Sequence, residues 1–284
     1  EISSSSSFIV TSLVAVQRLG NYLSVVGNKL TMIGTGSAEI DFILKQLNQD
    51  NTESGEEIEI SNNKQNSISI NKLTFKYKNN RELLSNLNLE FCSGRVSIIA
   101  GPSGSGKSTL LSLILKECEP IEGNIKINGI LLNKISKKSF YSNLSFVSQS
   151  PFIFGTSILS NIKIGKIDAS YQEIIKASKD SGSYDFINRL PDKFQFEVSD
   201  GGKNLSGGQC QMISLTRSVL KDSPIVFLDE PSNNLDKESI KRLKEIFLLW
   251  AEQNKLVIVI THDQRLIDER FDIYNIENYN LIKK

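Results

Sequence analysis

A glycine-rich loop at residues 101–108 carries the clearest chemical signal in the sequence. It reads Gly-Pro-Ser-Gly-Ser-Gly-Lys-Ser and matches the pattern GxxxxGK[ST] in full. The apolar run 96–100 precedes it and a predicted helix begins at Lys107, which is the context that the pattern requires. Glycines let successive backbone N–H groups point at phosphate oxygens, and the helix N-terminus adds partial positive charge. We therefore expect a phosphate-binding loop, with Lys107 on the β- and γ-phosphates and the Ser108 hydroxyl on Mg²⁺.

Two carboxylates, Asp229 and Glu230, directly follow a second apolar run, 225–228. A buried strand that ends in this way places both side chains at the carboxyl edge of a sheet, beside the phosphate loop. There Asp229 suits the Mg²⁺ shell, and Glu230 suits a base that polarises an attacking water. The simpler interpretation is an acidic turn before Pro231, and the neighbouring phosphate loop argues against it.

The only histidine, His262, follows a third apolar run, 256–260, together with Thr261 and Asp263. A single histidine after a strand is usually structural. Here the predicted strand delivers the imidazole to the same edge as the carboxylates, where it could hold a γ-phosphate. A metal site built from several histidines is excluded.

A second glycine motif, Leu-Ser-Gly-Gly-Gln at 205–209, stands immediately before another predicted helix. Serine and two glycines ahead of a helix N-terminus make a second phosphate cradle. A helix-capping role would explain Ser206 but not the two glycines. Because the chain has two cradles and one GxxxxGK[ST] loop, the second cradle is predicted to serve the nucleotide of another chain.

Composition narrows the class of protein. The chain has 284 residues, with 33 Lys+Arg, 32 Asp+Glu and a net charge of +1, which disfavours binding to duplex nucleic acid. Its three cysteines, Cys92, Cys118 and Cys210, form no CxxC pair. Neither a disulfide framework nor a zinc site is therefore supported, and a reducing compartment is favoured.

The elements that must position these residues follow from hydrophobic patterning. Residues 68–77 and 87–91 alternate apolar and polar side chains, as half-buried antiparallel strands do. The runs 96–100, 225–228 and 256–260 are continuously apolar, which is typical of parallel strands covered on both faces. Helices are predicted at 107–118, 209–220 and 240–250. The expected architecture is an α/β domain with a parallel core and a small antiparallel lobe ahead of it.

The N-terminal part reads as a long helix over 8–47, followed by a polar, acidic linker over 48–67. The helix begins with a mostly apolar stretch of nine residues, 8–16, whereas about 20 apolar residues are needed to cross a bilayer. It could pack on its own domain, or it could be the cytosolic end of a membrane helix. The chain begins with Glu1 and shows no signal peptide, so we expect it to be cut from a longer protein.

The motifs GPSGSGKST, LSGGQ, IVFLDEP and THD, in this order, resemble the nucleotide-binding domain of ABC ATPases from about Ile68 to the C-terminus. The resemblance implies a P-loop NTPase core with a parallel sheet, a small antiparallel β subdomain and a helical subdomain at about 150–220. It also implies ATP and Mg²⁺ as ligands and ATP hydrolysis. Two such domains would sandwich two nucleotides head to tail, each between one P-loop and the partner's LSGGQ.

The resemblance also assigns roles to single residues. Tyr77 would stack on adenine, Gln149 would sense Mg²⁺ and the membrane domain, and Asp236 would lie in a loop, 233–236, that crosses the dimer interface. The expected catalytic residues are Glu230, His262 and Gln149, and the expected Mg²⁺ ligands are Ser108, Gln149 and Asp229. The expected ATP contacts are Tyr77, Gly101, Pro102, Ser103, Gly104, Ser105, Gly106, Lys107, Ser108 and Thr109, and those to the partner's ATP are Leu205, Ser206, Gly207, Gly208 and Gln209.

Two local features are similar to ABC exporters. Residues 150–162, SPFIFGTSILSNI, follow the exporter pattern, and residues 36–44 look like the end of the last transmembrane helix. The resemblance implies that 1–47 is the truncated end of a membrane domain, 48–67 a linker and 68–284 the ATPase domain. The expected parent is a multi-pass half-transporter of the plasma or inner membrane with this domain on the cytoplasmic side. Its expected partners are a second nucleotide-binding domain, as a homodimer, and its own transmembrane domain, without nucleic acid.

Departures from the family pattern lie near the second glycine motif. Cys210-Gln211-Met212 stand where basic residues are usual, and Asp200-Gly201 stand where the family has Glu-Arg. We expect these departures to affect coupling to the membrane domain more than ATP binding.

Three other roles fit the sequence less well. The ATPase subunit of an importer is opposed by the N-terminal helix and by residues 152–162. A soluble ABC ATPase acting on nucleic acid or ribosomes is opposed by the charge balance, by the lack of coiled coil in 110–204 and by the single visible ATPase cassette. A binding module without turnover is opposed by Glu230.

Overall fold

A computed structural model describes residues 55–76, 82–102, 104–277 and 280–283. The predicted helix at 8–47 lies outside these residues, as do Tyr77 and Ser103. Among the helices of the described ranges, none has the length and apolar character needed to span a bilayer.

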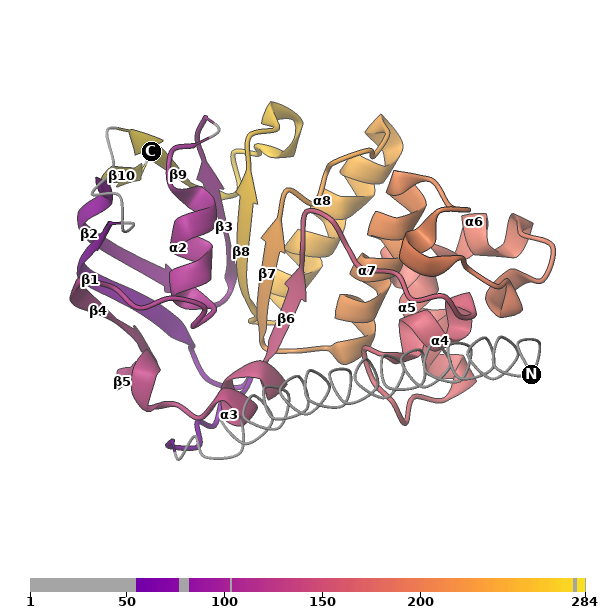
Figure 1. The fold of residues 1–284 in the computed structure, drawn as a ribbon, viewed down its shortest axis with the longest axis horizontal. Coiled ribbons are helices and arrows are strands. Elements are labelled where there is room, and N and C mark those ends of the chain that lie inside the picture. Colours follow the sequence, from indigo (N-terminus) through magenta and orange to yellow (C-terminus); the bar gives the residue numbers. More distant parts are fainter. Residues whose placement is uncertain (1–54, 77–81, 103, 278–279, 284) are drawn as a thin grey trace, which may run out of the picture. The chain divides into compact units, whose positions relative to one another are not determined.

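The main sheet has the strand order β10-β9-β3-β8-β7-β6 (Figure 1). Neighbouring strands are parallel except β9 and β10. The predicted strands at 96–100, 225–228 and 256–260 are confirmed as its central members β3, β7 and β8. The strands are β3 (Arg95–Ala100), β6 (Leu144–Val147), β7 (Ile225–Asp229), β8 (Leu256–Thr261), β9 (Asp272–Glu277) and β10 (Asn280–Lys283).

A separate antiparallel sheet has the order β2-β1-β4-β5 and forms the predicted small lobe. Only β1 and β2 precede the parallel core as predicted, since β4 and β5 follow β3 in the chain, and β2 begins earlier than the predicted strand 87–91. Its strands are β1 (Ser67–Lys76), β2 (Glu82–Cys92), β4 (Glu122–Ile127) and β5 (Ile130–Leu131). The pairing Ile68 with Phe91 and Ile70 with Leu89 fixes β1 against β2. These apolar side chains face a common core, which accounts for the alternating sequence pattern.

The helices are α2 (Lys107–Ile114), α3 (Lys137–Ser142), α4 (Ile158–Lys163), α5 (Tyr171–Ser181), α6 (Tyr184–Arg189), α7 (Gly207–Lys221) and α8 (Lys237–Glu252). The predicted helix 107–118 is too long, because Lys116 adopts a left-handed φ of +62° and the helix ends at Ile114. Figure 1 shows α4, α5 and α6 gathered around α7 beyond β6. Their shared core of residues between Ile153 and Leu220 is the helical part expected of the fold.

Both faces of the main sheet are covered, which explains why its central strands are apolar without alternation. Ile99 and Ile258 point into a core shared with α2 and the antiparallel sheet. Ile98 and Val257, one residue earlier on each strand, point to the other side, where they pack with α7 and α8. The sheet is therefore held rigidly between two layers, and its loops extend from a fixed platform.

A buried hydroxyl cluster joins α7 to the turn between α5 and α6. Thr216 Oγ1 lies 2.7 Å from the carbonyl oxygen of Met212 and 2.8 Å from the hydroxyls of Ser181 and Ser183. Thr216, Ser181 and Ser183 are all fully buried. Because all three are buried, these hydroxyls bond to one another and to the carbonyl oxygens of Ser178 and Met212.

Thr216→Val is expected to lower the free energy of unfolding by about 1–3 kcal/mol, because it leaves two buried serine hydroxyls short of a partner. Chemical denaturation followed by circular dichroism measures this change. Thr216→Ser keeps the hydroxyl and is expected to retain more stability than the valine variant. Equal stability of the valine variant and the unmodified chain would contradict the assigned network.

Candidate functional site

The carboxyl ends of the three central strands meet at the same level. Ala100 of β3 pairs with Thr261 of β8, and Asp229 of β7 pairs with Ile260 of β8. The phosphate loop begins at the next residue after Ala100, and Glu230 and His262 directly follow the other two strands. Strand register thus brings the predicted loop, carboxylates and histidine to one edge, as the sequence predicts.

Lys107 lies at the start of α2 and is buried. Its Nζ donates hydrogen bonds to the carbonyl oxygens of Gly101 at 2.7 Å and Pro102 at 2.9 Å. Burial lowers the pKa of Lys107, and the negative charges of Glu230 and Asp229 partly oppose that shift. The ammonium group is therefore held over the loop, in the field of both carboxylates.

The loop requires glycine at specific places. Gly104 and Gly106 adopt positive φ values of +80° and +100°, which other residues rarely adopt. A β-carbon on Gly106 would also lie 3.0 Å from the carbonyl oxygen of Leu83. The Ser105 hydroxyl is buried and, within the described part of the chain, has no hydrogen-bond partner. Curled backbone and an unpaired buried hydroxyl fit a bound phosphate group.

Glu230 is held by the end of β8. Its Oε2 accepts hydrogen bonds from Thr261 Oγ1 at 3.1 Å and from the backbone N–H of His262 at 3.3 Å, while its Oε1 lies 2.6 Å from His262 Nδ1. Its own backbone N–H donates to the carbonyl oxygen of Ile260 at 2.8 Å. The residue adopts a left-handed φ of +47°, a conformation that costs on the order of 1 kcal/mol for a non-glycine residue. The surrounding bonds impose one orientation on this carboxylate.

Asp229 and Gln149 approach the same edge from β7 and β6. Asp229 is partly buried, and burial together with the charge of Glu230 raises its pKa, whereas Lys107 lowers it. Gln149 is exposed and follows the end of β6, the strand that pairs with β7. The exposed Ser108 is the second residue of α2. Oxygen donors are thus available from three elements around the phosphate loop.

The second glycine motif forms the N-terminus of α7. Ser206 caps this helix in a capping box: its Oγ accepts from the N–H of Gln209 at 3.2 Å, and its N–H donates to Gln209 Oε1 at 2.8 Å. The two glycines have a packing reason that sequence analysis missed. A β-carbon on Gly207 would lie 2.9 Å from the side chain of Asn234, and one on Gly208 would lie 2.7 Å from the carbonyl oxygen of Asn234.

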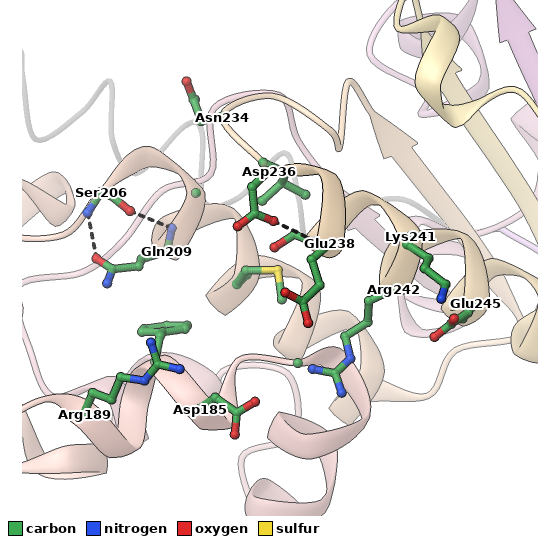
Figure 2. A pocket seen from close by; sticks show the side chains of 16 residues that line it. Asp185, Arg189, Ser206, Gln209, Asn234, Asp236, Glu238, Lys241, Arg242 and Glu245 are labelled. Carbon is green, nitrogen blue, oxygen red and sulfur yellow. Dashed lines mark hydrogen bonds between the residues drawn. The ribbon is translucent and has the colours of Figure 1, made fainter.

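A cavity of about 550 Å³ lies beside this helix start (Figure 2). Ser206 and Gln209 line it from α7, Asp185 and Arg189 from α6, and Asp236 from the cap of α8. None of the described residues of the phosphate loop lines it. The second glycine motif and the described residues of the phosphate loop therefore do not line this cavity together.

The family departures near this motif have local explanations. Cys210 is buried, and its thiol donates to the carbonyl oxygen of Gly202 at 3.8 Å. Burial raises the pKa of this thiol. Gly201 adopts a φ of +72° and faces open space, so the turn favours glycine over arginine.

Asn161 and Arg217 are structural residues of the site region that the sequence analysis did not single out. The Arg217 guanidinium donates to the carbonyl oxygens of Phe152 and Asn161 at 2.7 and 2.8 Å and to Asn161 Oδ1 at 2.6 Å. Fully buried Asn161 also donates to the carbonyl oxygen of Phe154 at 3.0 Å. These bonds tie the segment after Gln149 to α7. In SILSNI, at 157–162, Asn161 stands next to the apolar residue Ile162. A large polar side chain beside apolar residues is the signal that could have indicated a buried, hydrogen-bonded Asn161.

Comparisons with known proteins place this geometry in a family. The family model described as "ABC transporter" matches residues 84–233. A probable ABC transporter ATP-binding/permease protein of Haemophilus influenzae is 37% identical over 212 residues, which are 74% of this chain and 38% of that protein. ABC transporter B family member 13 of Arabidopsis thaliana is 34% identical over 256 residues, 89% of this chain and 20% of its own length.

A solved structure agrees with these matches. The structure of a bacterial Atm1-family ABC exporter with ATP bound superposes with a TM-score of 0.75 and 30% identity, over 80% of this chain and 40% of that one. The chain thus spans 38% of the Haemophilus relative's length and about the same share of the solved exporter. The chain belongs to the ABC transporter family and contains a nucleotide-binding domain of the exporter type.

Proposed function

We propose that this domain binds ATP with Mg²⁺ at residues 101–109, hydrolyses it, and thereby drives export of a substrate by a longer membrane protein. One observation carries the proposal: the carboxyl ends of β3, β7 and β8 lie in register at one edge of the sheet. That edge holds Lys107, Asp229, Glu230 and His262. Phosphoryl transfer depends mainly on positioning and on charge placement, and this edge supplies both.

The residues present fit the phosphates of ATP and a divalent cation. Positive φ glycines and the unpaired Ser105 hydroxyl form a cradle in which Lys107 carries the positive charge. Two adjacent carboxylates, Asp229 and Glu230, face one ammonium group, which leaves negative charge that a divalent cation would balance. Hard oxygen donors from Ser108, Asp229 and Gln149 suit Mg²⁺, which when bound would neutralise charge on the phosphate oxygens.

Glu230 is proposed to take the proton of the attacking water, because its buried carboxylate is fixed by three neighbouring groups. More than half of the His262 side chain is exposed, so the ring is accessible to a phosphate group while its partner carboxylate stays buried. Tyr77, proposed to stack on adenine, and Ser103 are also proposed ATP contacts, and both lie outside the described residues.

The second motif is proposed to contact the ATP of a second copy of this domain. The cavity beside Ser206 takes none of the described residues of the phosphate loop, so a nucleotide held there would come from another chain. The loop with Asp236 lies against the two glycines and would reach the same interface. Two copies arranged head to tail would complete both sites.

The membrane domain is proposed as the second partner. Phe152 and Phe154 are 63% and 48% exposed and pack edge to face, with ring centroids 4.8 Å apart. Exposed aromatic pairs held by a rigid backbone suit a protein interface. Relatives described as ATP-binding/permease proteins, and as a β-(1→2)glucan export ATP-binding/permease protein in Bartonella quintana, support an exporter over a separate importer subunit.

The same relatives support a membrane location with this domain on the cytoplasmic side. The match to the Arabidopsis protein covers 89% of this chain, more than the part after residue 54, so it extends into the N-terminal segment. We propose that residues 1–47 are the end of a membrane domain and 48–67 a linker to the ATPase domain at 68–284.

Lys107→Ala is expected to weaken ATP binding by about 10- to 100-fold, because it removes the charge that faces the phosphates. Titration of the 284-residue chain with a fluorescent ATP analogue measures the dissociation constant. Lys163→Ala, which removes an exposed lysine at the end of α4, is the matched control and is expected to bind as the unmodified chain does. Unchanged affinity in Lys107→Ala would overturn the phosphate-loop assignment.

Glu230→Gln is expected to keep ATP binding and to lower the hydrolysis rate by about 10²- to 10⁴-fold, since the amide cannot accept the proton. Phosphate release and size-exclusion chromatography with ATP measure turnover and dimer formation. Glu252→Gln, at the end of α8, is the control for loss of a carboxylate. Turnover at the unmodified rate in Glu230→Gln would mean that the base lies elsewhere.

Ser206→Arg is expected to abolish hydrolysis while each chain still binds ATP, because the large side chain blocks the interface and not the phosphate loop. Ser170→Arg is a matched control, since Ser170 caps α5 with the same capping box. Binding and hydrolysis are measured on the same preparations. Normal hydrolysis by Ser206→Arg would argue against the head-to-tail arrangement.

A further inference from the structure

We propose that Thr261 is a positioning residue for the reaction, and that its hydroxyl aims the carboxylate of Glu230. This inference rests on the proposed role of Glu230 as the base. Thr261 is the last residue of β8 and is 1% exposed. Its Oγ1 donates to Glu230 Oε2 at 3.1 Å, across the buried edge between β7 and β8.

A second hydrogen bond fixes the direction of the hydroxyl proton. Thr261 Oγ1 accepts the backbone N–H of Asp263 at 3.0 Å. A hydroxyl has one proton, and once it accepts from a backbone amide its proton is directed to a different partner. The carboxylate of Glu230 is that partner. The threonine therefore acts as a donor of defined direction rather than as a freely rotating group.

Strand register explains why this residue and no other reaches the carboxylate from β8. Asp229 pairs with Ile260, so the next residues along the two strands, Glu230 and Thr261, lie at the same level. The left-handed φ of Glu230 turns its side chain back toward β8. A strand residue at this level that lacked a hydroxyl would leave Oε2 with the longer 3.3 Å bond from the His262 N–H.

The threonine and the histidine serve the carboxylate differently. The His262 side chain is 56% exposed, and its Nδ1 contacts Oε1 at 2.6 Å. Thr261 is enclosed, and its hydroxyl bonds to the other carboxylate oxygen, Oε2. The Thr261 hydroxyl thus holds Oε2 of the base, whereas the imidazole contacts Oε1.

The test compares Thr261→Val and Thr261→Ser in the 284-residue chain. Valine preserves shape and removes the hydroxyl, and it is expected to lower kcat about 10-fold while the ATP dissociation constant changes less than twofold. Serine restores the hydroxyl and is expected to recover most of kcat. Unchanged kcat in the valine variant, or a serine variant as slow as valine, would overturn the inference.

A double variant separates this inference from the proposed function. In a Glu230→Gln background, Thr261→Val is expected to cause no further loss of the residual rate, because it acts through that carboxylate. A further tenfold loss would show that Thr261 acts elsewhere and would overturn the inference alone. Normal turnover in Glu230→Gln by itself would instead overturn the choice of base, and with it the target of Thr261.

Thr216→Val is the matched control for replacing a buried threonine. Its hydroxyl bonds to Met212, Ser181 and Ser183, away from the sheet edge. It is expected to lose stability and to keep kcat. A tenfold loss of kcat in this control would mean that destabilisation alone lowers turnover, and the result for Thr261→Val would then count against a positioning role.

Discussion

The register of β7, β8 and β3 is the constraint on which the rest of the site depends. Six consecutive pairs, from Arg95 with Leu256 to Ala100 with Thr261, fix β3 against β8, and the pairing of Asp229 with Ile260 fixes β7. A slip of one residue would reverse which face each side chain takes and would separate Glu230 from Thr261. Apolar layers on both faces prevent such a slip, so core packing sets the geometry of the polar edge.

Much of the fold could be predicted from the sequence because its central strands are covered on both faces. Continuous apolar runs such as 256–260 identify β8 directly, and the glycine loop marks the end of β3. Strands β6, β9 and β10 were not predicted, because β6 is short and the polar residue Asn275 interrupts the apolar run in β9. The predicted end of α2 at residue 118 was wrong, since no proline or glycine marks the left-handed turn at Lys116.

The residues of the candidate site also fall into those that the sequence predicts and those that it does not. Lys107, Asp229, Glu230 and His262 could be predicted because each stands next to a strand end or a motif. The bonds from Arg217 to the backbone of Phe152 and Asn161 could not, because they join segments more than 50 residues apart through carbonyl groups. Local patterns indicate which residues end an element. Contacts between residues far apart in the chain depend on how the elements pack against one another. The pattern of a single sequence does not predict that packing.

The close packing of Asn234 against Gly207 and Gly208 affects how far the motif LSGGQ can serve as evidence of catalytic activity. Packing against the carbonyl oxygen of Asn234 inside one chain already disfavours any larger residue at Gly208, and capping of α7 already favours Ser206 and Gln209. Such a motif would persist in a descendant that had lost turnover, as long as the fold was retained. Its presence is therefore weak evidence of catalytic competence. Glu230 is the more diagnostic residue, because its left-handed backbone accompanies a buried carboxylate that contacts the exposed imidazole of His262.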